Sequence, residues 1–403
     1  MLLTPTRPIA VAPLPTPAAR PKLLFLATED WYFWSDRLPF ARALRDAGCD
    51  IVVAAREQGH GARIRGEGFA LLPLAWRRRG DGILDAARAL RAIVRIYRRE
   101  RPSIVNHIAL KPILFGGIAR RAAFAGHRQG CRPVAVNWVM GLGIGFAGAT
   151  PAARLRRRLL GWALRLTASG PKDRIVVQNP DDGALLARLG IEPARIVLIR
   201  GSGVDSAHFT PLPQPAGPTV TVALVGRLLR SKGVVEAVEA VRRLRAEGRP
   251  VELVLAGAPD PDSRDSLDEG VLAGLAGEPG IEWLGRVEDV RTVWRRAAIA
   301  VLPSTYGEGL PRALLEAAAC ARPIIASDVP GCREVVCPGV TGLLVPPGDV
   351  AALAASIAAL ADDPARRQAM GLAARALVER ELSLSLVACQ TMTFYLELLG
   401  DEG

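Results

Sequence analysis

The chain has 403 residues and a mass of 42.9 kDa, with half of its residues apolar and 23% charged. These values exclude a peptide, a coiled-coil rod and a disulfide mini-protein, and predict two or three globular domains. The net charge of +12 is unevenly distributed, because residues 1–210 carry +18 and residues 211–403 carry −6. A basic half suggests that this half alone meets an anionic surface, either nucleic acid or lipid headgroups.

The six cysteines form no CxxC pair and have no His at metal-ligand spacing, so we expect reduced thiols in a cytoplasmic protein. Prolines interrupt residues 1–20, which we expect to form a disordered leader and not a signal peptide. Residues 133–153 carry no charge. Their glycines and proline favour a buried strand with a glycine loop over a membrane span.

Apolar runs alternate with amphipathic segments throughout the first half of the chain. A strand at 22–28 is followed by an aromatic loop and then by a helix, a glycine stop and a strand that ends near residue 55. Further strands are expected at 70–75, 104–109, 134–139, 174–179 and 195–200, with helices at 82–100, after Pro112 and at 152–166. This alternation predicts a doubly wound parallel sheet over residues 21–210.

The segment 211–218 is rich in proline and is expected to be a linker. The alternation then restarts, with strands at 221–227, 251–257, 281–285, 298–304, 323–328 and 342–348. Helices are expected at 233–247, 267–276, 288–297, 311–321, 349–362 and 364–380. We therefore predict an α/β chain with a second Rossmann-like domain at 219–380, and a C-terminal helix at 381–403 that packs on the first domain. Two facing domains of this kind would place a ligand between them.

The segment Glu308-Gly-Leu-Pro-Arg-Ala-Leu-Leu-Glu316 has two carboxylates on either side of a helix start. Pro311 suits a first helical turn, Gly309 allows close approach of the backbone to a ligand, and the helix N-terminus favours an anion. An alternative is that Glu316 only pairs with Arg312 and that Glu308 is a solvated loop residue.

A second segment follows a strand and runs from Gly226-Arg227 to Lys232-Gly233. Arg227 and Lys232 together could hold a diphosphate, which would remove the need for Mg²⁺. Two other patterns carry less weight. The GxGxxG at 143–148 lacks the context of a dinucleotide site, and Asp260-Pro-Asp262 lies in a polar loop where metal coordination is not expected.

The second half resembles the retaining GT-B glycosyltransferases of family 4, through the segments 226–233, 281–290, 301–336 and 339–349. The first half resembles a subgroup acting on lipid-linked saccharides in bacterial O-antigen, capsule or exopolysaccharide assembly, through 31–55, 106–123, 136–146, 177–182 and 200–211. Many relatives have Gly-Gly after the first strand, where this chain has Glu29-Asp30-Trp31.

The resemblance implies roles for individual residues. In the donor site, Glu316 would bind the nucleotide ribose, Gly226, Arg227 and Lys232 the diphosphate, and Glu308 with the backbone of Gly309 and Leu310 the transferred sugar. His107 would contact that sugar near the reaction centre, as a catalytic residue beside Glu308, although a hydrogen-bonded histidine at a strand end is the alternative. Trp34, Arg37 and Lys111 would bind the acceptor.

The resulting hypothesis is a GT-B enzyme that transfers a sugar, from a UDP-sugar in preference, to a polyprenyl-diphosphate-linked saccharide with retention. No cofactor, metal or nucleic acid is expected. An anionic membrane surface is an expected partner, reached through Arg154–Arg158 with Leu155, Leu159 and Trp162, and through Arg77–Arg79. The alternatives are a nucleotide-sugar epimerase on the same fold and a non-catalytic scaffold.

Overall fold

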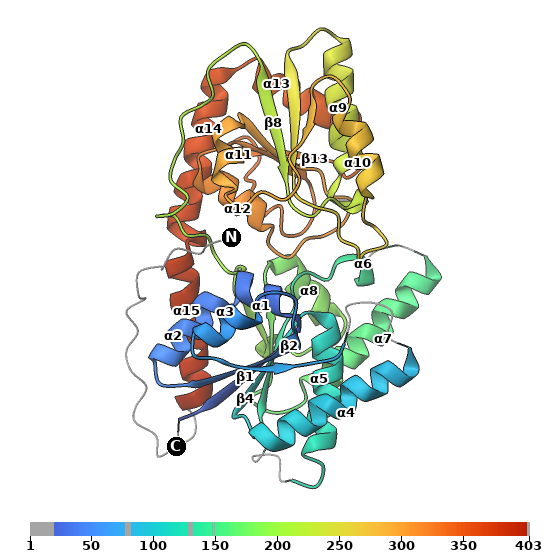
Figure 1. The fold of residues 1–403 in the computed structure, drawn as a ribbon, viewed down its shortest axis with the longest axis vertical. Helices are drawn as coiled ribbons and strands as arrows, with labels where there is room; N and C mark the ends of the chain where they lie inside the picture. The colour runs from blue at the N-terminus through green and yellow to red at the C-terminus, as the bar shows by residue number, and fades with distance from the viewer. Residues whose placement is uncertain (1–19, 77–81, 128–131, 147, 149, 401–403) are drawn as a thin grey trace. The chain divides into compact units, whose positions relative to one another are not determined.

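The computed structural model describes residues 20–76, 82–127, 132–146, 148 and 150–400. Contacts divide these residues into two compact units. The N-terminal unit runs to Ser202 and includes the chain from Val387 onward, and the C-terminal unit is Gly203–Leu386. Each unit is built on its own parallel sheet with helices on both faces (Figure 1). The predicted fold class of two Rossmann-like domains is confirmed.

The N-terminal unit has a seven-stranded parallel sheet in the order β3-β2-β1-β4-β5-β6-β7. Its strands are β1 Lys22–Glu29, β2 Asp50–Arg56, β3 Ala70–Pro73, β4 Ile104–Ile108, β5 Val134–Trp138, β6 Arg174–Val177 and β7 Ile196–Leu198. Its helices are α1 Asp30–Asp36, α2 Leu38–Asp46, α3 Gly61–Gly66, α4 Ile83–Glu100, α5 Leu110–Ala123, α6 Gly143–Phe146, α7 Pro151–Thr167 and α8 Pro180–Arg188, with a 3-10 turn at Pro193–Arg195. Helix α15, Leu384–Gly400, belongs to this unit from Val387 onward.

The order of the strands reverses between β1 and β4, which lie side by side in the sheet. Beyond the carboxyl ends of strands at such a switch point, open α/β sheets bind their ligands. In this unit β1 ends at Glu29 and is followed by Asp30, and β4 ends at Ile108 and is followed by Ala109.

One expectation for this edge was wrong. The aromatic segment after β1, expected to be a loop, forms helix α1. Phe33 is fully buried and its ring lies edge-on to those of Phe25, at 5.5 Å, and Phe69, at 6.1 Å. Burial of this side chain against the sheet holds the helical turn in place.

The C-terminal unit has a six-stranded parallel sheet in the order β10-β9-β8-β11-β12-β13. Its strands are β8 Val220–Val225, β9 Val251–Ala256, β10 Ile281–Trp283, β11 Ile299–Leu302, β12 Ile324–Ser327 and β13 Gly342–Val345. Its helices are α9 Val234–Ala246, α10 Glu269–Ala276, α11 Arg291–Arg296, α12 Arg312–Ala319, α13 Val350–Ala361 and α14 Pro364–Leu377, with a 3-10 turn at Arg230–Lys232 and a π-helical turn at Val378–Leu382.

The boundary between the units falls earlier in the chain than the expected linker at 211–218. The prolines of that segment prevent a helix or strand, but they do not prevent packing. The backbone N–H of Leu212 donates to the carbonyl of Cys320, and Arg322 donates to the carbonyl of Pro213 at 2.7 Å. The segment is therefore bound to the C-terminal unit.

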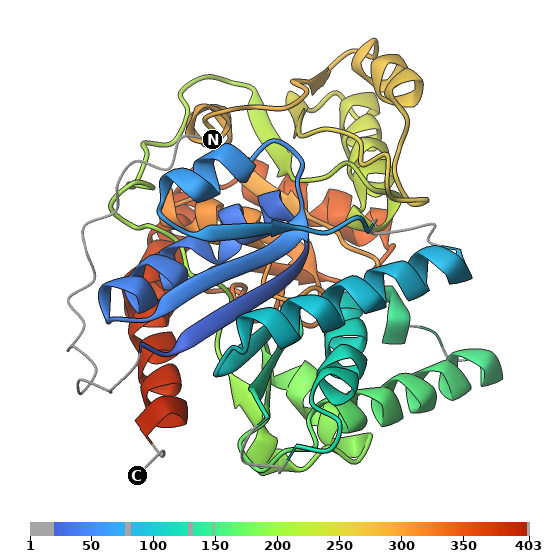
Figure 2. The same cartoon turned by 60° about the horizontal axis from the view of Figure 1, so that its bottom comes forward.

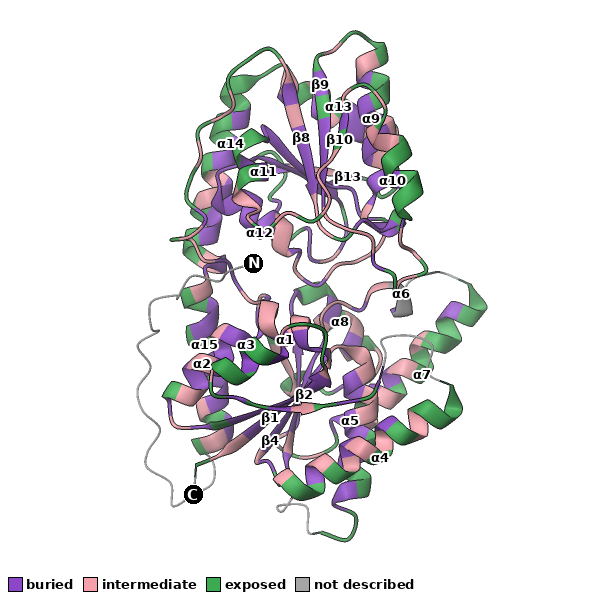
Figure 3. Cartoon of the chain, in the orientation of Figure 1, coloured by how far each residue is buried: buried purple, intermediate pink, exposed green. Residues whose placement is uncertain are grey.

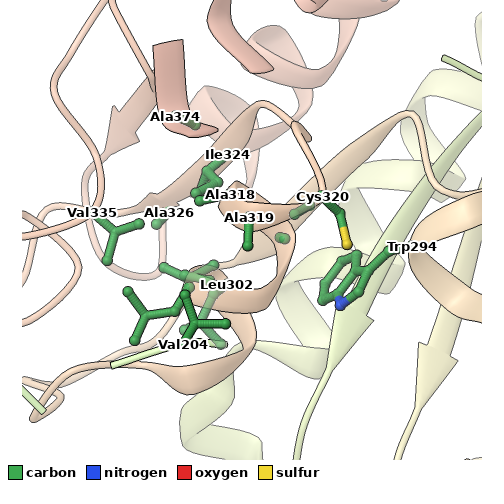
Figure 4. Packing of buried hydrophobic residues seen from close by; sticks show 14 of the residues in the cluster. Val204, Trp294, Leu302, Ala318, Ala319, Cys320, Ile324, Ala326, Val335 and Ala374 are labelled. Atoms are coloured by element: carbon green, nitrogen blue, oxygen red, sulfur yellow. The ribbon is translucent and has the colours of Figure 1, made fainter. Parts of the chain in front are cut away.

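Strand interiors are buried in both units, and exposed residues lie mainly on the outer faces of helices (Figure 3). In the C-terminal unit, Ala318 and Ala319 of α12 and the following Cys320 lie in one buried cluster with Leu302 of β11 and Trp294 of α11 (Figure 4). This packing fixes the helix that carries Glu316. No helix among the described residues is both long enough and apolar enough to cross a membrane.

Candidate functional site

The carboxyl ends of β8 and β11 hold a close pair of opposite charges. Lys232 lies in the 3-10 turn after β8, and its Nζ lies 2.6 and 2.7 Å from the two carboxylate oxygens of Glu308, in the loop after β11. Ser304 donates a further hydrogen bond to Glu308, at 2.6 Å. The Lys232 side chain is 17% exposed and that of Glu308 11%, so solvent weakens this pair only in part.

Close backbone packing holds the two loops together. Gly233 follows Lys232 with φ of +76°, and a Cβ there would overlap the carbonyl of Pro303. Gly331 has φ of +81°, and a Cβ there would overlap the carbonyl of Gly309. Only glycine allows both the left-handed conformation and this approach, so the loops around Glu308 are fixed by backbone geometry.

Arg227 forms a second ion pair at the same edge of the sheet. Its Nη1 lies 2.7 Å from Oδ2 of Asp260, in the loop after β9. Asp260 is buried, whereas the Arg227 side chain is 48% exposed, so the guanidinium is open to solvent on one side. Asp260 belongs to the DxD pattern, and the structure shows it orienting an arginine. Among the described residues, no group of three or more His, Cys, Asp or Glu is arranged to hold a metal ion.

Glu316 lies within α12, where its carboxylate is largely buried and accepts a hydrogen bond from Nε of Arg312 at 2.8 Å. The ion pair with Arg312 that the sequence allowed is therefore formed. Gly309 is buried before the helix, and Leu310 packs against the hydrophobic core. Of the predicted donor-site residues, the structure thus brings Lys232 and Glu308 into direct contact.

His107 lies in the interior of the N-terminal unit. It is fully buried in β4, with Nε2 2.9 Å from the hydroxyl of Tyr97 and Nδ1 2.7 Å from Oδ1 of Asn137. A Cβ at Gly116 would overlap its ring, so α5 closes over it. Burial lowers the pKa of His107 to about 4. These two partners give His107 the environment of the alternative stated above, a hydrogen-bonded histidine at a strand end.

Arg37 is also buried, but its hydrogen-bonding capacity is only partly used. Its guanidinium lies 4.0 Å from the ring centroid of Trp138, and Nη2 donates to the sulfur of Met140 at 2.9 Å. Nε and Nη1 have no hydrogen-bond partner. Burial lowers the pKa of Arg37. A thioether is a weak acceptor, so this arginine is held mainly by its stacking on Trp138.

The other two predicted acceptor residues lie at different places in the unit. The ammonium of Lys111 lies 5.4 Å from the ring centroid of Trp76 and 5.6 Å from that of Phe115. Trp34, in α1, is partly exposed and lies 6.1 Å from His60, measured between ring centroids. The printed ring contacts of the three residues are thus with different aromatic neighbours: Trp138 for Arg37, Trp76 and Phe115 for Lys111, and His60 for Trp34.

Two family models match the chain. The model described as "Glycosyl transferase 4-like domain" matches residues 38–201, and the model "Glycosyl transferases group 1" matches residues 219–363. The chain belongs to the GT-B glycosyltransferases.

Curated proteins of similar sequence support this family membership. It is 35% identical to alpha-maltose-1-phosphate synthase of Mycobacterium tuberculosis over 231 residues, 51% of this chain and 57% of that protein. It is 32% identical to D-inositol 3-phosphate glycosyltransferase of Kribbella flavida over 232 residues, 50% of this chain and 51% of that protein. The chain thus spans little more than half the length of these relatives.

Solved structures of similar fold include sucrose-phosphate synthase from Thermosynechococcus elongatus, with a TM-score of 0.76, 21% identity, and coverage of 95% of this chain and 100% of that one. Anabaena HepE in complex with UDP and glucose has a TM-score of 0.72 and 17% identity, and covers 93% of this chain and 99% of that one. At these identities the likeness establishes the fold.

Two features of this glycosyltransferase were not found from the sequence. One is the ion pair between Asp260 and Arg227. Each residue follows a strand, and the two strands are neighbours in the sheet, so their positions could have indicated the pair. The other is Ala109, between β4 and α5, with φ of 73° and ψ of 168°. This region is essentially restricted to glycine, and an alanine gives no sign of it. Its amide donates to the carbonyl of Trp138 at 3.0 Å, which anchors the strained turn at the switch point.

Proposed function

We propose that this chain transfers a sugar from a nucleotide-diphosphate donor, a UDP-sugar in preference, with retention of configuration. The observation that carries the proposal is the pair of cations, Arg227 and Lys232, at the carboxyl edge of the C-terminal sheet beside the glycine-fixed loop of Glu308. Anabaena HepE, which shares the fold, was solved in complex with UDP and glucose, and this is consistent with a UDP-sugar donor here.

In this proposal the donor diphosphate becomes an additional partner of the two cations, beside their carboxylate partners. Arg227, half exposed, offers its solvent-facing nitrogens, and Lys232 shares its ammonium between Glu308 and phosphate. The glycosidic bond to phosphate breaks as the acceptor hydroxyl attacks from the same face. The leaving phosphate accepts the hydroxyl proton, and the two cations stabilise the charge that develops on it. These cations supply the charge that Mg²⁺ would otherwise supply, so no metal is required.

We assign the acceptor to a polyprenyl-diphosphate-linked saccharide at an anionic membrane surface. Helix α7 supports this assignment, because Leu155, Leu159 and Trp162 are each more than half exposed among its arginines. Helix α4 begins with Ile83 and Leu84, which are 91% and 72% exposed. Figures 1 and 2 both show the first turns of α4 and α7 on the same side of the unit. Arg77–Arg79 lie outside the described residues.

The enzymatic proposal is tested by incubating the protein with UDP-, GDP- and dTDP-sugars and a lipid-linked saccharide extract from bacterial membranes. We expect sugar transfer from one of the UDP-sugars, at the same rate with and without EDTA. Loss of transfer in EDTA with recovery on addition of Mg²⁺ would contradict the role given to Arg227 and Lys232. The absence of UDP binding in calorimetry would contradict the donor class.

The membrane proposal is tested by co-sedimentation with vesicles of phosphatidylcholine and phosphatidylglycerol. Binding is expected to rise with the fraction of phosphatidylglycerol and to weaken in high salt. The test variant replaces four α7 arginines with serine: Arg154, Arg156, Arg157 and Arg158. The control removes the same charge from the C-terminal unit: Arg242, Arg243, Arg249 and Arg296. Equal loss of binding in the two variants would show an effect of net charge alone and remove α7 from the proposal.

A further inference from the structure

The loop after β9, residues 257–268, is bonded to the loop after β8 that carries both cations of the donor site. At its start, Gly257 comes so close to the preceding strand end that a Cβ there would overlap the carbonyl oxygen of Gly226. Near its end, Ser266 forms an antiparallel bridge with Leu229. The loop after β9 therefore supports the cation-bearing loop at both of its ends.

Within this support, Asp260 holds Arg227 by one nitrogen. Its Oδ2 accepts from Nη1 of Arg227 at 2.7 Å, and the Arg227 side chain is 48% exposed against 8% for Asp260. The aspartate is itself fixed, because Oδ1 accepts from the N–H of Asp262 at 3.2 Å and its own N–H donates to the hydroxyl of Ser266 at 2.8 Å. A guanidinium is planar, so fixing one nitrogen restricts the direction in which its other N–H groups point.

Asp265 holds the backbone that carries Lys232. Oδ2 of Asp265 accepts from the N–H of Ser231 at 3.1 Å and also from its hydroxyl. The carbonyl of Asp265 accepts from the N–H of Arg230 at 2.8 Å, so two successive residues before Lys232 are held. Ser231 is buried, and its carbonyl accepts from the N–H of Thr305, in the loop after β11, at 2.9 Å. These bonds fix the turn from which the Lys232 side chain extends.

Both cations are already paired with carboxylates, so the two pairs together carry no net charge. Arg227 pairs with Asp260, and Lys232 pairs with Glu308. Attraction by net charge would therefore add little to the binding of a diphosphate. Charge-assisted hydrogen bonds depend on the direction of the donor groups as well as on their charge. The side chains that set these directions should consequently govern the affinity for the donor.

We propose that Asp260 and Asp265 are positioning residues for the donor diphosphate, with Asp260 acting on Arg227 and Asp265 acting on Lys232 through Ser231. The inference rests on the proposed function and deepens it, because it assigns part of diphosphate recognition to a loop outside the two segments that carry the cations. Neither aspartate is expected to contact the phosphates, which its negative charge would repel. The acidic residues of this loop act through cations of the chain itself.

Three substitutions of aspartate by asparagine in this loop test the proposal, because each removes one negative charge and keeps the size of the side chain. Asp260→Asn and Asp265→Asn alter the two positioning residues. Asp268→Asn is the matched control, since Asp268 is exposed and caps α10 by accepting from the N–H of Val271, which asparagine does equally well. Asp260→Ser is a second variant at the first position, where a shorter side chain no longer reaches Arg227. UDP affinity is measured by calorimetry, and thermal unfolding establishes that each variant is folded.

Positioning and net charge predict changes of opposite sign in UDP affinity. We expect the affinity to fall by about three-fold to ten-fold in Asp260→Asn and Asp265→Asn, and to stay within about two-fold of wild type in Asp268→Asn. The loss caused by Asp260→Asn should vanish in an Arg227→Gln background and persist in a Lys232→Met background, which a general effect on folding would not produce. Unchanged or higher affinity in Asp260→Asn and Asp265→Asn, or an equal loss in Asp268→Asn, would overturn the inference. A wild-type protein that does not bind UDP would instead refute the proposed function.

Discussion

Replacing Lys232 with methionine should destabilise the C-terminal unit and weaken nucleotide binding at the same time. The ammonium contacts both oxygens of Glu308 at 2.6 and 2.7 Å in a site from which most water is excluded. Removing one partner of a fully buried pair costs about 3–5 kcal/mol, because the other charge is left behind. Here Ser304 still donates to Glu308 and some solvent reaches the pair, so we expect about 2–3 kcal/mol.

Calorimetric unfolding measures this effect directly. A loss of about 2–3 kcal/mol should lower the midpoint of the transition assigned to the C-terminal unit by about 5–10 °C. Glu308→Gln should have a smaller effect, and the double variant should be more stable than the sum of the single changes by about 1–2 kcal/mol. Titration with UDP should show affinity reduced about 10-fold to 100-fold in Lys232→Met. Additivity of the two changes within about 0.5 kcal/mol would refute the coupling of these side chains.

Three further predictions concern single residues. Glu316→Gln should weaken UDP binding in calorimetry, whereas Glu308→Gln should lower the rate of transfer with less effect on UDP; equal losses of affinity would contradict these roles. Burial lowers the pKa of His107 from 6.5 to about 4, so its neutral form is favoured by folding. Its contribution to stability is present above pH 6.5 and is lost as the pH falls toward 4, by about 3 kcal/mol. His107→Gln should flatten this part of the pH profile of thermal unfolding, and a profile unchanged by the substitution would argue against a buried neutral ring. Ala109→Gly should raise the unfolding midpoint, because relief of about 1–3 kcal/mol of backbone strain exceeds the entropy cost of glycine; a lower midpoint would show that the strain is absent.

The architecture could be predicted from the sequence alone. Strands buried on both faces appear as continuous apolar runs, and helices buried on one face appear as apolar residues repeated every three to four positions. Most strands of both sheets were predicted near their observed positions. The loop of Glu308 and the turn of Lys232 were also found, since glycines that permit close packing mark them locally. The segment after β1 was missed, because its run of aromatic side chains has no periodic pattern until Phe33 meets its neighbours in the core.

Only the tertiary structure shows which residues that lie far apart in the chain contact each other. Lys232 and Glu308 are 76 residues apart and meet because β8 and β11 are neighbours in the sheet. From the sequence, a histidine at the end of a strand could face either a ligand or the interior. In the structure His107 is hydrogen-bonded to Tyr97 of α4 and Asn137 of β5, so it faces the interior. A pattern of residues reports which positions are buried, whereas the partner of a buried polar group depends on how strands and helices are ordered in space.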